Sequence, residues 1–539
     1  MNPDVLVIGS GIGGLSTAIN IALTGKKVIM VSPYASERSQ SVMAAGGINA
    51  AINNSGENDS SLLHCYDTLK AGCFLENEDA VRGLCDRAPL IIEWLESIGV
   101  VFNRKEDRTL DARYFGGQEK KRTVYAGAAT GKLIVTALVR KCRELEAKGM
   151  ISRRIGLNFY QALIKDNQCY GAVFYNHIDS TVEAIYADNT VVATGGMNRL
   201  FGKTTGSSLC DGYAVGKLFE QGVVLRNLEF IQYHPTTIET AHKRMLITEA
   251  ARGEGGRLFY IKDSKRVYFM EDMYGEKGNL MTRDVVSREI YNAPSSVYLD
   301  ITFLGEEHIK GRLREVYNLC LEYLKLDVTK EPIPVAPSVH FFMGGIAVDN
   351  KHRTNISNLY AVGECASIYH GANRLGGNSL LGAVYGGVVV SEALTATASE
   401  VPDFSDEINR IRDSINKRRV SESMYPATYI YRELAGIMND KLGIVRNKDK
   451  LSEGIDSIDF YIKAVEKMAF DPDITVAESY SVKNILLLSK AILMSALFRK
   501  ESRGAHYRED YKERSKEYEF PTLVSLDKGE IKVKLQRDI

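Results

Sequence analysis

The sequence has few of the patterns that bind metals or cross-link chains. Its eight cysteines, among 539 residues, form no C-x-x-C pair and no C-x-x-C-H motif, which argues against zinc, iron–sulfur and c-type haem sites on this chain. We therefore expect no metal centre and interpret the cysteines as reduced packing residues. Only 12 prolines accompany 46 glycines, so the glycines indicate tight turns and close backbone contacts, not low complexity.

The chain also lacks a net charge and a long apolar run. Its 68 basic residues balance 68 acidic ones, so an anionic partner has to be held by locally placed cations. The apolar stretch 485–497 is interrupted by Ser489, Lys490 and Ser495, and residues 1–4 leave no room for a signal peptide. We predict no membrane-spanning segment and a cytoplasmic protein, peripheral on a membrane only through partner subunits.

A glycine-rich turn is the first positive signal. Residues 4–8 form an apolar run typical of a strand in a parallel sheet, and the turn 9–14 follows directly. Residues 15–23 then have the pattern of a helix, and 27–31 that of a second strand. In this context a G-x-G-x-x-G motif predicts a dinucleotide site, because glycines let the backbone approach a pyrophosphate at the positive end of a helix. The three glycines are Gly9, Gly11 and Gly14.

Two later strands also end in glycine. One runs into Thr194 and Gly195, and the other into Gly363 and Glu364, at the strand ends where ligands of open α/β sheets bind. The pattern predicts a split nucleotide-binding domain with a separate domain inserted in it. Beyond residue 403 the apolar residues take helical spacing, and alternation over 531–535 predicts a short terminal strand. The predicted domains are 1–228 with 340–402, 229–339, 403–515 and a tail, 516–539.

Several polar donors lie beside the glycine turns. Individually each has an ordinary explanation: a histidine beside proline is often a packing residue, and an arginine beside aspartate is often a solvated ion pair. Together they are what a dianionic substrate needs in a neutral protein, because guanidinium groups bind carboxylates in a bidentate manner and imidazoles add directional bonds. They are His234, Thr248, Arg252, Arg283, His340 and Arg374.

Seven short motifs occur in an order that resembles a known family. Over about residues 4–515 the chain resembles the flavoprotein subunit of the succinate dehydrogenase and fumarate reductase family, and this similarity includes Glu501–Asp510 near the end. The motifs are AGGINAA at 45–51, FGG at 115–117, QYHPT at 232–236, TEAARGEGG at 248–256, TRD at 282–284, HFFMGG at 340–345 and HGANRLGGNSL at 370–380.

The resemblance implies a fold, a cofactor and a partner. The fold would be α/β: a split Rossmann-like FAD-binding domain with an inserted α+β capping domain and a C-terminal helical domain. Electrons would come through an iron–sulfur subunit of the same complex, with a membrane anchor or another electron-donor subunit behind it. The residues implied to contact FAD are Gly9, Gly11, Gly14, Ser39, Gln40, Ser41, Gly46, Gly47, Thr194, Gly195, Asp211, Glu364, Ser379 and Leu380.

The resemblance also implies a mechanism. A C4 dicarboxylate, fumarate or succinate, would be held through its two carboxylates while hydride passes between flavin N5 and one carbon. Arg283 would deliver or accept the proton on the other carbon, and Glu249 and Arg252 would relay protons to it. A guanidinium is a weak acid, so this role requires rapid re-protonation and predicts Glu249 close to Arg252. The capping domain would close and exclude water. The implied carboxylate ligands are His234, Thr248, His340 and Arg374.

One position departs from the family pattern. Where the family commonly has a histidine bonded covalently to the flavin, the segment 38–42 reads Arg-Ser-Gln-Ser-Val and has Gln40. Glutamine has no ring nitrogen to attack the flavin, so we predict non-covalent FAD. Because covalent attachment in the family generally raises the flavin potential, its absence favours fumarate reduction; the alternative is that succinate oxidation persists at reduced efficiency.

Two alternative functions stay open. L-aspartate oxidase shares most of these motifs and has non-covalent FAD, but it usually has Glu before the Gly-Gly, where this chain has Phe115. An apolar wall there offers no counter-ion to a substrate ammonium and favours an unsubstituted dicarboxylate. A non-catalytic FAD-containing RNA-binding or assembly protein is the alternative of another class. Zero net charge and the lack of a basic run with interleaved aromatics argue against it.

Overall fold

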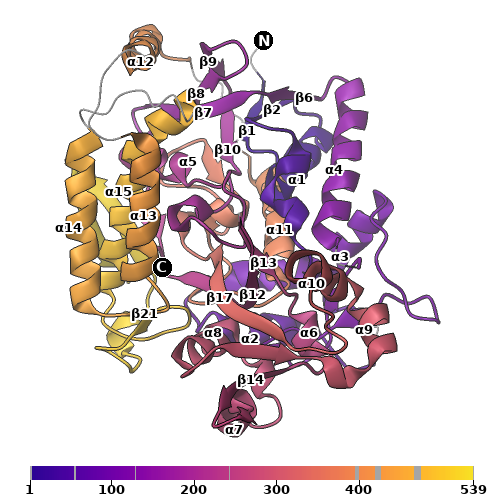
Figure 1. Ribbon diagram of the computed structural model, residues 1–539. Helices are drawn as coiled ribbons and strands as arrows, with labels where there is room; N and C mark the ends of the chain where they lie inside the picture. Colours follow the sequence, from indigo (N-terminus) through magenta and orange to yellow (C-terminus); the bar gives the residue numbers. More distant parts are fainter. Residues whose placement is uncertain are drawn as a thin grey trace.

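The computed structural model has three parts: a parallel sheet with its helices, an inserted segment and a group of C-terminal helices (Figure 1). The sheet and the helices beside it hold the N-terminal part of the chain, the inserted segment forms the lower part of the view, and the C-terminal helices stand at one side. This arrangement confirms the predicted fold class. The residues that the structure describes are 3–53, 56–127, 129–241, 243–394, 400–418, 426–465 and 475–537.

The five-stranded sheet carries the predicted glycine turn. Its order is β19-β10-β1-β2-β6, and every neighbouring pair is parallel. The strands are short and apolar, and β1 is buried along its whole length, as expected for a sheet covered on both faces. Segments more than 300 residues apart, β1 and β19, thus belong to one sheet. The strands are β1 (Val5–Ile8), β2 (Val28–Ser32), β6 (Ile151–Ile155), β10 (Asn189–Val192) and β19 (Leu359–Ala361).

Two of the helices beside this sheet pack closely on each other because small residues line their contact. Helix α1 (Ile12–Leu23) packs against α11 (Asn378–Ala393) and α4 (Thr130–Ala147). The Ser16 hydroxyl donates to the Val384 carbonyl at 2.8 Å, and a Cβ on Gly387 would lie 2.5 Å from the Thr17 nitrogen. A side chain at residue 387 would therefore push the two helices apart.

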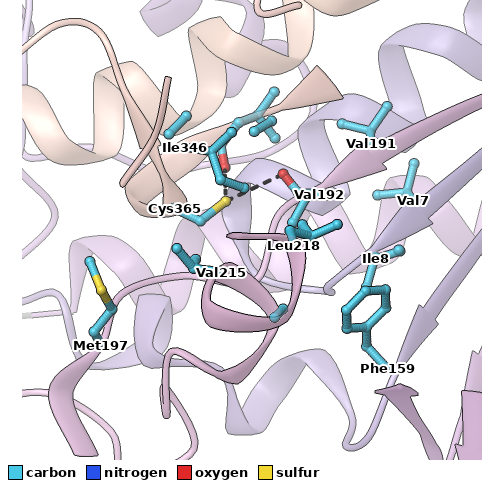
Figure 2. Packing of buried hydrophobic residues seen from close by; sticks show 14 of the residues in the cluster. Val7, Ile8, Phe159, Val191, Val192, Met197, Val215, Leu218, Ile346 and Cys365 are labelled. Carbon is cyan, nitrogen blue, oxygen red and sulfur yellow. Dashed lines mark hydrogen bonds between the residues drawn. The ribbon is translucent and has the colours of Figure 1, made fainter. Parts of the chain in front are cut away.

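Apolar side chains fill the space behind the sheet. Figure 2 shows Val7 and Val191 of the central strands near Val215 and Leu218 of α5 (Tyr213–Glu220). Burying side chains of this kind contributes roughly 1.5–3 kcal/mol each. The Cys365 thiol belongs to the same cluster, and all eight cysteines are buried without a disulfide, which confirms their packing role.

Two further groups of elements complete the N-terminal part. An antiparallel sheet, β7-β8-β9, leads from β6 to β10, and a three-stranded sheet, β3-β5-β4, lies in the segment before α4. Two helices that pack against each other, α2 and α3, connect β3 to β4. The bounds are β3 (Ile48–Asn49), α2 (Ser61–Ala71), α3 (Glu78–Ser97), β4 (Ala112–Arg113), β5 (Thr123–Val124), β7 (Leu157–Lys165), β8 (Gln168–Asn176) and β9 (Thr181–Tyr186).

The inserted segment has its own sheet and its own core. Six strands follow the order β13-β12-β17-β16-β14-β15, and a separate hydrophobic cluster runs from Ile238 to Val335. Phe115 from the N-terminal part joins that cluster. The boundaries 229–339 stay a prediction. The elements are β12 (Ile231–Glu239), β13 (Arg244–Leu246), α6 (Ala250–Gly253), β14 (Arg257–Lys262), β15 (Lys265–Val267), α7 (Phe269–Tyr274), α8 (Arg283–Asn292), β16 (Val297–Asp300), α9 (Glu306–Arg312), α10 (Arg314–Leu324) and β17 (Ile333–Phe342).

Four helices form the described C-terminal part, as predicted. Helix α15 is longer and more apolar than the interrupted stretch 485–497 suggested: by length and composition it would pass as a membrane span. Most of it is buried against α14, α13 and α5, so in this structure it is a core helix. Beyond Phe498 the segment to residue 515 contains one short strand, β22 (Tyr507–Arg508), which pairs with β21 (Val445–Arg446), where we predicted helix. The helices are α12 (Ser405–Arg418), α13 (Ala427–Lys441), α14 (Lys448–Val465) and α15 (Val476–Phe498).

The predicted terminal strand is confirmed, and it belongs to a larger sheet. Strand β24 pairs with β23, and β23 pairs with β11, directly before the inserted segment. Residues 522–535 are therefore integrated in the fold, whereas we predicted a separate tail over 516–539. The sheet order is β20-β18-β11-β23-β24, with β11 (Leu225–Arg226), β18 (Gly345–Ala347), β20 (Ala366–Ser367), β23 (Thr522–Asp527) and β24 (Glu530–Leu535).

Candidate active site

A long pocket lies at the carboxyl ends of the parallel strands. Residues at the ends of β1, β2, β10 and β19 line it, which is where open α/β sheets bind ligands. Gly9, directly after β1, has φ +116°, and a Cβ there would lie 2.2 Å from the Ala193 carbonyl oxygen. The predicted cofactor residues on the pocket wall are Gly9, Gly11, Ser39, Gln40, Ser41, Thr194, Gly195, Asp211, Glu364, Ser379 and Leu380.

Three predicted cofactor glycines do not line the pocket. Each lies where a side chain would collide with neighbouring protein atoms: a Cβ on Gly14 would be 2.0 Å from the Gly9 carbonyl oxygen, and one on Gly47 would be 2.6 Å from the Val124 carbonyl oxygen. A Cβ on Gly46 would lie 3.0 Å from the Phe115 ring. These glycines are required because the protein packs closely around them, in the layer of residues next to the pocket wall.

The residues of the pocket fit a flavin dinucleotide. Helix α1 starts at the pocket: its first N–H, of Ile12, donates to the Ser41 hydroxyl at 3.2 Å, and the N–H groups that follow it can bind a pyrophosphate. The Ser39 hydroxyl and His370 Nδ1 line the pocket and are buried without a hydrogen-bond partner in the described part of the chain. Buried polar atoms of this kind are rare in proteins and indicate a ligand that satisfies them.

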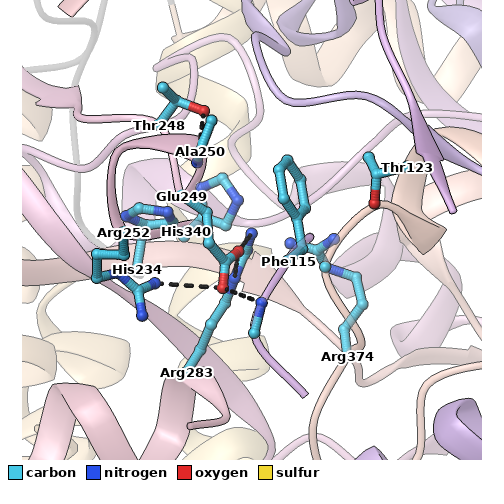
Figure 3. A network of polar contacts seen from close by, with 12 residues as sticks. Phe115, Thr123, His234, Thr248, Glu249, Ala250, Arg252, Arg283, His340 and Arg374 are labelled. Carbon is cyan, nitrogen blue, oxygen red and sulfur yellow. Dashed lines mark hydrogen bonds and ion pairs between the residues drawn. The ribbon is translucent and has the colours of Figure 1, made fainter. Parts of the chain in front are cut away.

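A second cluster, next to the pocket, contains buried charged groups (Figure 3). Glu249 lies between Arg283 and Arg252: one carboxylate oxygen accepts from Arg283 Nη2 at 2.7 Å and from Nε at 3.0 Å, and the other accepts from Arg252 Nη2 at 3.2 Å. The predicted proximity of Glu249 and Arg252 is confirmed. The Gly116 backbone N–H also donates to Glu249 at 2.9 Å, so the carboxylate is fixed from three sides.

The elements explain this geometry. Arg283 is the first residue of α8, and Arg252 lies on the short helix α6, which begins directly after Glu249. Their three side chains are almost completely buried. Burial alone would raise the pKa of Glu249, but the two guanidinium groups lower it to about 2. Glu249 is therefore a carboxylate throughout the physiological range.

Gln232 joins the two sides of the cluster, and sequence reasoning assigned it no role. Its Oε1 accepts from Arg283 Nη1 at 3.1 Å and from Arg374 Nη2 at 3.0 Å. Its Nε2 donates to Asn373 Oδ1 at 2.8 Å. Gln232 lies on β12 in the sheet of the inserted segment, whereas Arg374 follows the nucleotide-binding strands, so this amide connects the two parts at the site.

Two histidines face each other beside the arginines. The His234 and His340 rings are 5.3 Å apart in an edge-to-face arrangement, on the paired strands β12 and β17. Thr205 Oγ1 lies 2.8 Å from His340 Nδ1, a second contact that the sequence did not reveal. Burial first, then the charge of Arg283, lowers the pKa of both rings well below the ordinary range, so both are neutral at pH 7.

The cluster has more positive charge and more donors than its own residues satisfy. Three arginines face the carboxyl groups of Glu249 and Glu364, and burial together with Arg283 lowers the pKa of Arg374. Within the described residues, His234 Nε2, Arg252 Nε and Arg374 Nε are buried without a hydrogen-bond partner. Unpaired buried donors are costly, and a bound anion would satisfy them.

Phe115 and Thr248 complete the predicted set. Phe115 is buried and packs against Gly46 and Gly376, which leaves an apolar surface beside the cluster. Thr248 is buried, and its hydroxyl accepts from the Ala250 N–H at 3.3 Å, so it caps the segment that carries Glu249. In the described ranges no group of three His, Cys, Asp or Glu residues is arranged to hold a metal ion.

Comparisons with known proteins agree with this pocket. Residues 4–380 match the FAD binding domain family, which defines the chain as an FAD-dependent flavoprotein. Residues 431–538 match the family described as the C-terminal part of the fumarate reductase flavoprotein. Because relatives above 30% identity cover nearly the whole chain, the protein belongs to the succinate dehydrogenase and fumarate reductase flavoprotein subunit family.

Three relatives illustrate the similarity. The succinate dehydrogenase flavoprotein subunit of Bacillus subtilis is 36% identical over 97% of this chain and 93% of its own length. One subunit of the fumarate reductase (CoM/CoB) of Methanothermobacter marburgensis is 34% identical over 97% of both chains. A solved structure of a variant E. coli quinol fumarate reductase flavoprotein has a TM-score of 0.90 at 29% identity, covering 99% of this chain and 96% of that one.

Proposed function

We propose that this protein is the catalytic flavoprotein subunit of a fumarate reductase that interconverts fumarate and succinate, with FAD bound non-covalently. The observation that carries the proposal is the buried Arg252–Glu249–Arg283 chain next to the cofactor pocket, together with three buried side-chain nitrogens that have no partner among the described residues. A dianionic dicarboxylate matches both the excess positive charge and the unsatisfied donors. Family membership and the names of the relatives support the same reaction.

Bound FAD supplies hydride transfer, and the residues of the chain bind and orient the dicarboxylate. Arg374 offers a planar guanidinium to one carboxylate, and Nε2 of His234 offers a directional bond. His340 and Thr248 would contact the substrate as the resemblance implies. Because both histidines are neutral, their N–H groups donate without adding charge, and the apolar ring of Phe115 excludes water from one side.

Arg283 is the proposed proton donor for fumarate reduction. Its guanidinium gives a proton to the substrate carbon and recovers one through Glu249, whose carboxylate contacts both Arg283 and Arg252. Holding the three groups at hydrogen-bond distance makes each transfer short, which compensates for the weak acidity of a guanidinium. In succinate oxidation the same chain would carry the proton outward.

We also propose how the protein receives electrons. The relatives are named as subunits of succinate dehydrogenases and of fumarate reductases, including the 8-methylmenaquinol:fumarate reductase of Wolinella succinogenes. The described residues contain no metal-binding cluster, so an iron–sulfur subunit of the same complex would bring electrons from a membrane anchor or another donor subunit. The protein would then be cytoplasmic and peripheral on the membrane.

One assay separates the candidate reactions. The purified FAD-loaded protein is given fumarate with a reduced viologen dye, and, in parallel, succinate or L-aspartate with an oxidising dye. We expect fumarate-dependent dye oxidation faster than succinate-dependent dye reduction. Hydrogen peroxide formed from aspartate without fumarate turnover would assign the protein as an L-aspartate oxidase, and no turnover with any of the three would favour a non-catalytic role.

A second measurement tests the cofactor linkage. Denaturation in acid should release all FAD into solution, because Gln40 provides no nucleophilic ring nitrogen. Flavin fluorescence that stays on the denatured chain in a gel would contradict the non-covalent proposal. Gln40→His is the informative variant, and retained flavin fluorescence in that variant alone would show that residue 40 occupies the linkage position.

A further inference from the structure

Gln40 connects two segments of the cofactor pocket. It starts the short 3-10 helix η2 (Gln40–Met43), and its Nε2 donates to Glu364 Oε2 at 3.1 Å. Its Oε1 accepts from the Ser207 backbone N–H at 3.0 Å. All three residues belong to segments that line the pocket, so the side chain spans its wall. A glutamine at this position therefore does more than leave a covalent bond unmade.

Glu364 is the partner through which Gln40 acts. It lies in η6 (Gly363–Cys365), directly after β19, and its Oε1 accepts from the Phe342 N–H at 3.2 Å. A Cβ on Gly196 would lie 2.6 Å from that oxygen, so the strand end after β10 has to be glycine for the carboxyl group to fit. The carboxyl group is thus held from β17, β10 and η2 at once.

The charge of Glu364 changes near neutral pH. Burial raises its pKa to about 7, against the Phe342 N–H and the positive charge of Arg374, which both lower it. Arg374 faces Glu364 from the 370–377 segment, and the Cys210 thiol faces it from the segment before α5. An amide N–H donated to a carboxylate favours the charged form, so Gln40 opposes the effect of burial.

A negative charge beside a redox group disfavours the addition of electrons. In a pocket of low effective dielectric this interaction is strong, and hydrogen bonds and net charge around a cofactor are the protein's means of setting its potential. We propose that Gln40 is a positioning residue that holds the Glu364 carboxylate against the pocket and thereby sets the reduction potential of bound FAD and its dependence on pH. The inference rests on the FAD pocket of the proposed function and not on its substrate.

The sign of the effect follows from linkage. Reduction adds negative charge to the flavin, so the pKa of Glu364 is higher in the reduced protein than in the oxidised protein. At a pH between these two pKa values, reduction of the flavin is accompanied by the uptake of one proton at Glu364. In that interval the potential falls more steeply with pH. Without the Gln40 donor Glu364 ionises at higher pH, so the steep interval moves upward and the potential at pH 7.5 rises.

The test is a redox titration of the FAD-loaded protein with mediator dyes from pH 5.5 to 9, without dicarboxylate. In the wild type the flavin potential should fall more steeply with pH around neutral pH, and in Glu364→Gln this extra steepness should be absent. In Gln40→Leu the pH interval of steeper slope should move up by about one pH unit, the size expected for a lost charge-assisted hydrogen bond. The flavin potential at pH 7.5 should then rise by up to about 30 mV, which is a tenfold change in the two-electron equilibrium.

Two further variants keep the test decisive. Gln40→Glu retains an acceptor for the Ser207 N–H but puts a second carboxyl group beside Glu364, so it should move the interval further upward without creating a cavity. Val42→Ala, on the same 3-10 helix but not on the pocket wall, is the matched control and should titrate as wild type. Retained FAD absorbance per chain checks folding in each variant.

The outcomes separate this inference from the proposed reaction. Titration curves that coincide for wild type, Gln40→Leu and Gln40→Glu would overturn the role of Gln40, and an added slope that persists in Glu364→Gln would overturn the role of Glu364. Because no substrate is present, either result is independent of fumarate turnover. A protein inactive with fumarate that shows the predicted shifts would keep this inference and lose the proposed function.

Discussion

The molecule contains two buried networks of arginine and glutamate, and they differ in how completely they are satisfied. In the first, Arg252, Glu249 and Arg283 have an excess of positive charge, and nearby donors have no partner in the part of the chain that the structure describes. In the second, Arg499 and Arg503 face Glu229 and Glu501 in equal number. Buried arginine and glutamate side chains thus occur in two settings: the first network lies beside the cofactor pocket, and the second lies in the protein interior away from it.

The second network has its hydrogen bonds made within the protein. Arg499 donates to Glu229, to Glu501 and to the carbonyls of Tyr518 and Phe520. The hydroxyls of Ser495 and Thr522 complete the shell around Glu229, so the network ties α15 to β23. The difference teaches that a buried ion pair by itself says little about function; unpaired donors beside an excess charge indicate a ligand.

The largest expected effect comes from the proton donor. Arg283→Ala should lower kcat for fumarate by roughly 10²- to 10⁴-fold, the range for loss of a general acid, while FAD stays bound. Steady-state kinetics with reduced dye and the flavin absorbance of the purified variant measure both. Arg288→Ala, on the same helix but outside the cluster, is the control. An active Arg283→Ala protein would remove this residue from the proton-donor role.

The opposite result is expected in the satisfied network. Arg499→Ala leaves Glu229 and Glu501 buried without their partner, which should destabilise the fold by about 3–5 kcal/mol. Thermal unfolding followed by circular dichroism should show a much lower midpoint, and the folded protein at low temperature should keep near-normal kcat. The exposed neighbour in Lys500→Ala is the control. If Arg499→Ala instead lost turnover at unchanged stability, the division between the two networks would be wrong.

Acid should weaken the first network through Glu249. Its pKa in the folded protein, about 2, is below the ordinary 4.5, so its contribution to stability is present above pH 4.5 and is lost as the pH falls toward 2. Glu249→Gln removes this contribution, about 3 kcal/mol. The difference between wild type and variant in unfolding free energy should therefore be constant at neutral pH and vanish in acid. A difference that persisted at pH 2 would contradict the assigned charge.

The smallest expected effect comes from the support of a histidine. Thr205→Val removes the hydroxyl that contacts His340, which is worth about 0.5–1.5 kcal/mol. KM for fumarate should rise roughly 3- to 10-fold with little change in kcat, because the ring loses its fixed orientation but stays in place. Lys203→Ala, exposed nearby, is the control. An unchanged KM would show that packing against His234 alone orients His340.

The local signals of the sequence predicted the cofactor end of the molecule well. The strand–turn–helix pattern identified Gly9 and Gly11 on the pocket wall, and Gly9 is required for a local reason, a positive φ and a close carbonyl. The same pattern does not distinguish glycines that face a ligand from those that face another strand. Gly14 and Gly47 belong to the second kind.

Long-range contacts were harder to predict. Gln232 bridges Arg283 and Arg374, but a glutamine has no signature that separates such a role from an ordinary surface position. The strand order that brings β23 beside β11 depends on pairing across almost 300 residues, which no periodicity encodes. The helix α15 was underestimated because Ser489 and Lys490 interrupt an apolar run that tertiary packing nevertheless buries.

The contact between α1 and α11 has a consequence for how the protein folds. The helix that follows the glycine turn is joined to α11 by a hydrogen bond across 368 residues, from the Ser16 hydroxyl to the Val384 carbonyl. The cofactor pocket therefore cannot close before the inserted segment and the helix behind it are available. Closing a loop of that length is slow, and the unfinished sheet presents open strand edges meanwhile. We therefore expect cofactor binding to come late in folding, after the chain has been made as far as α11.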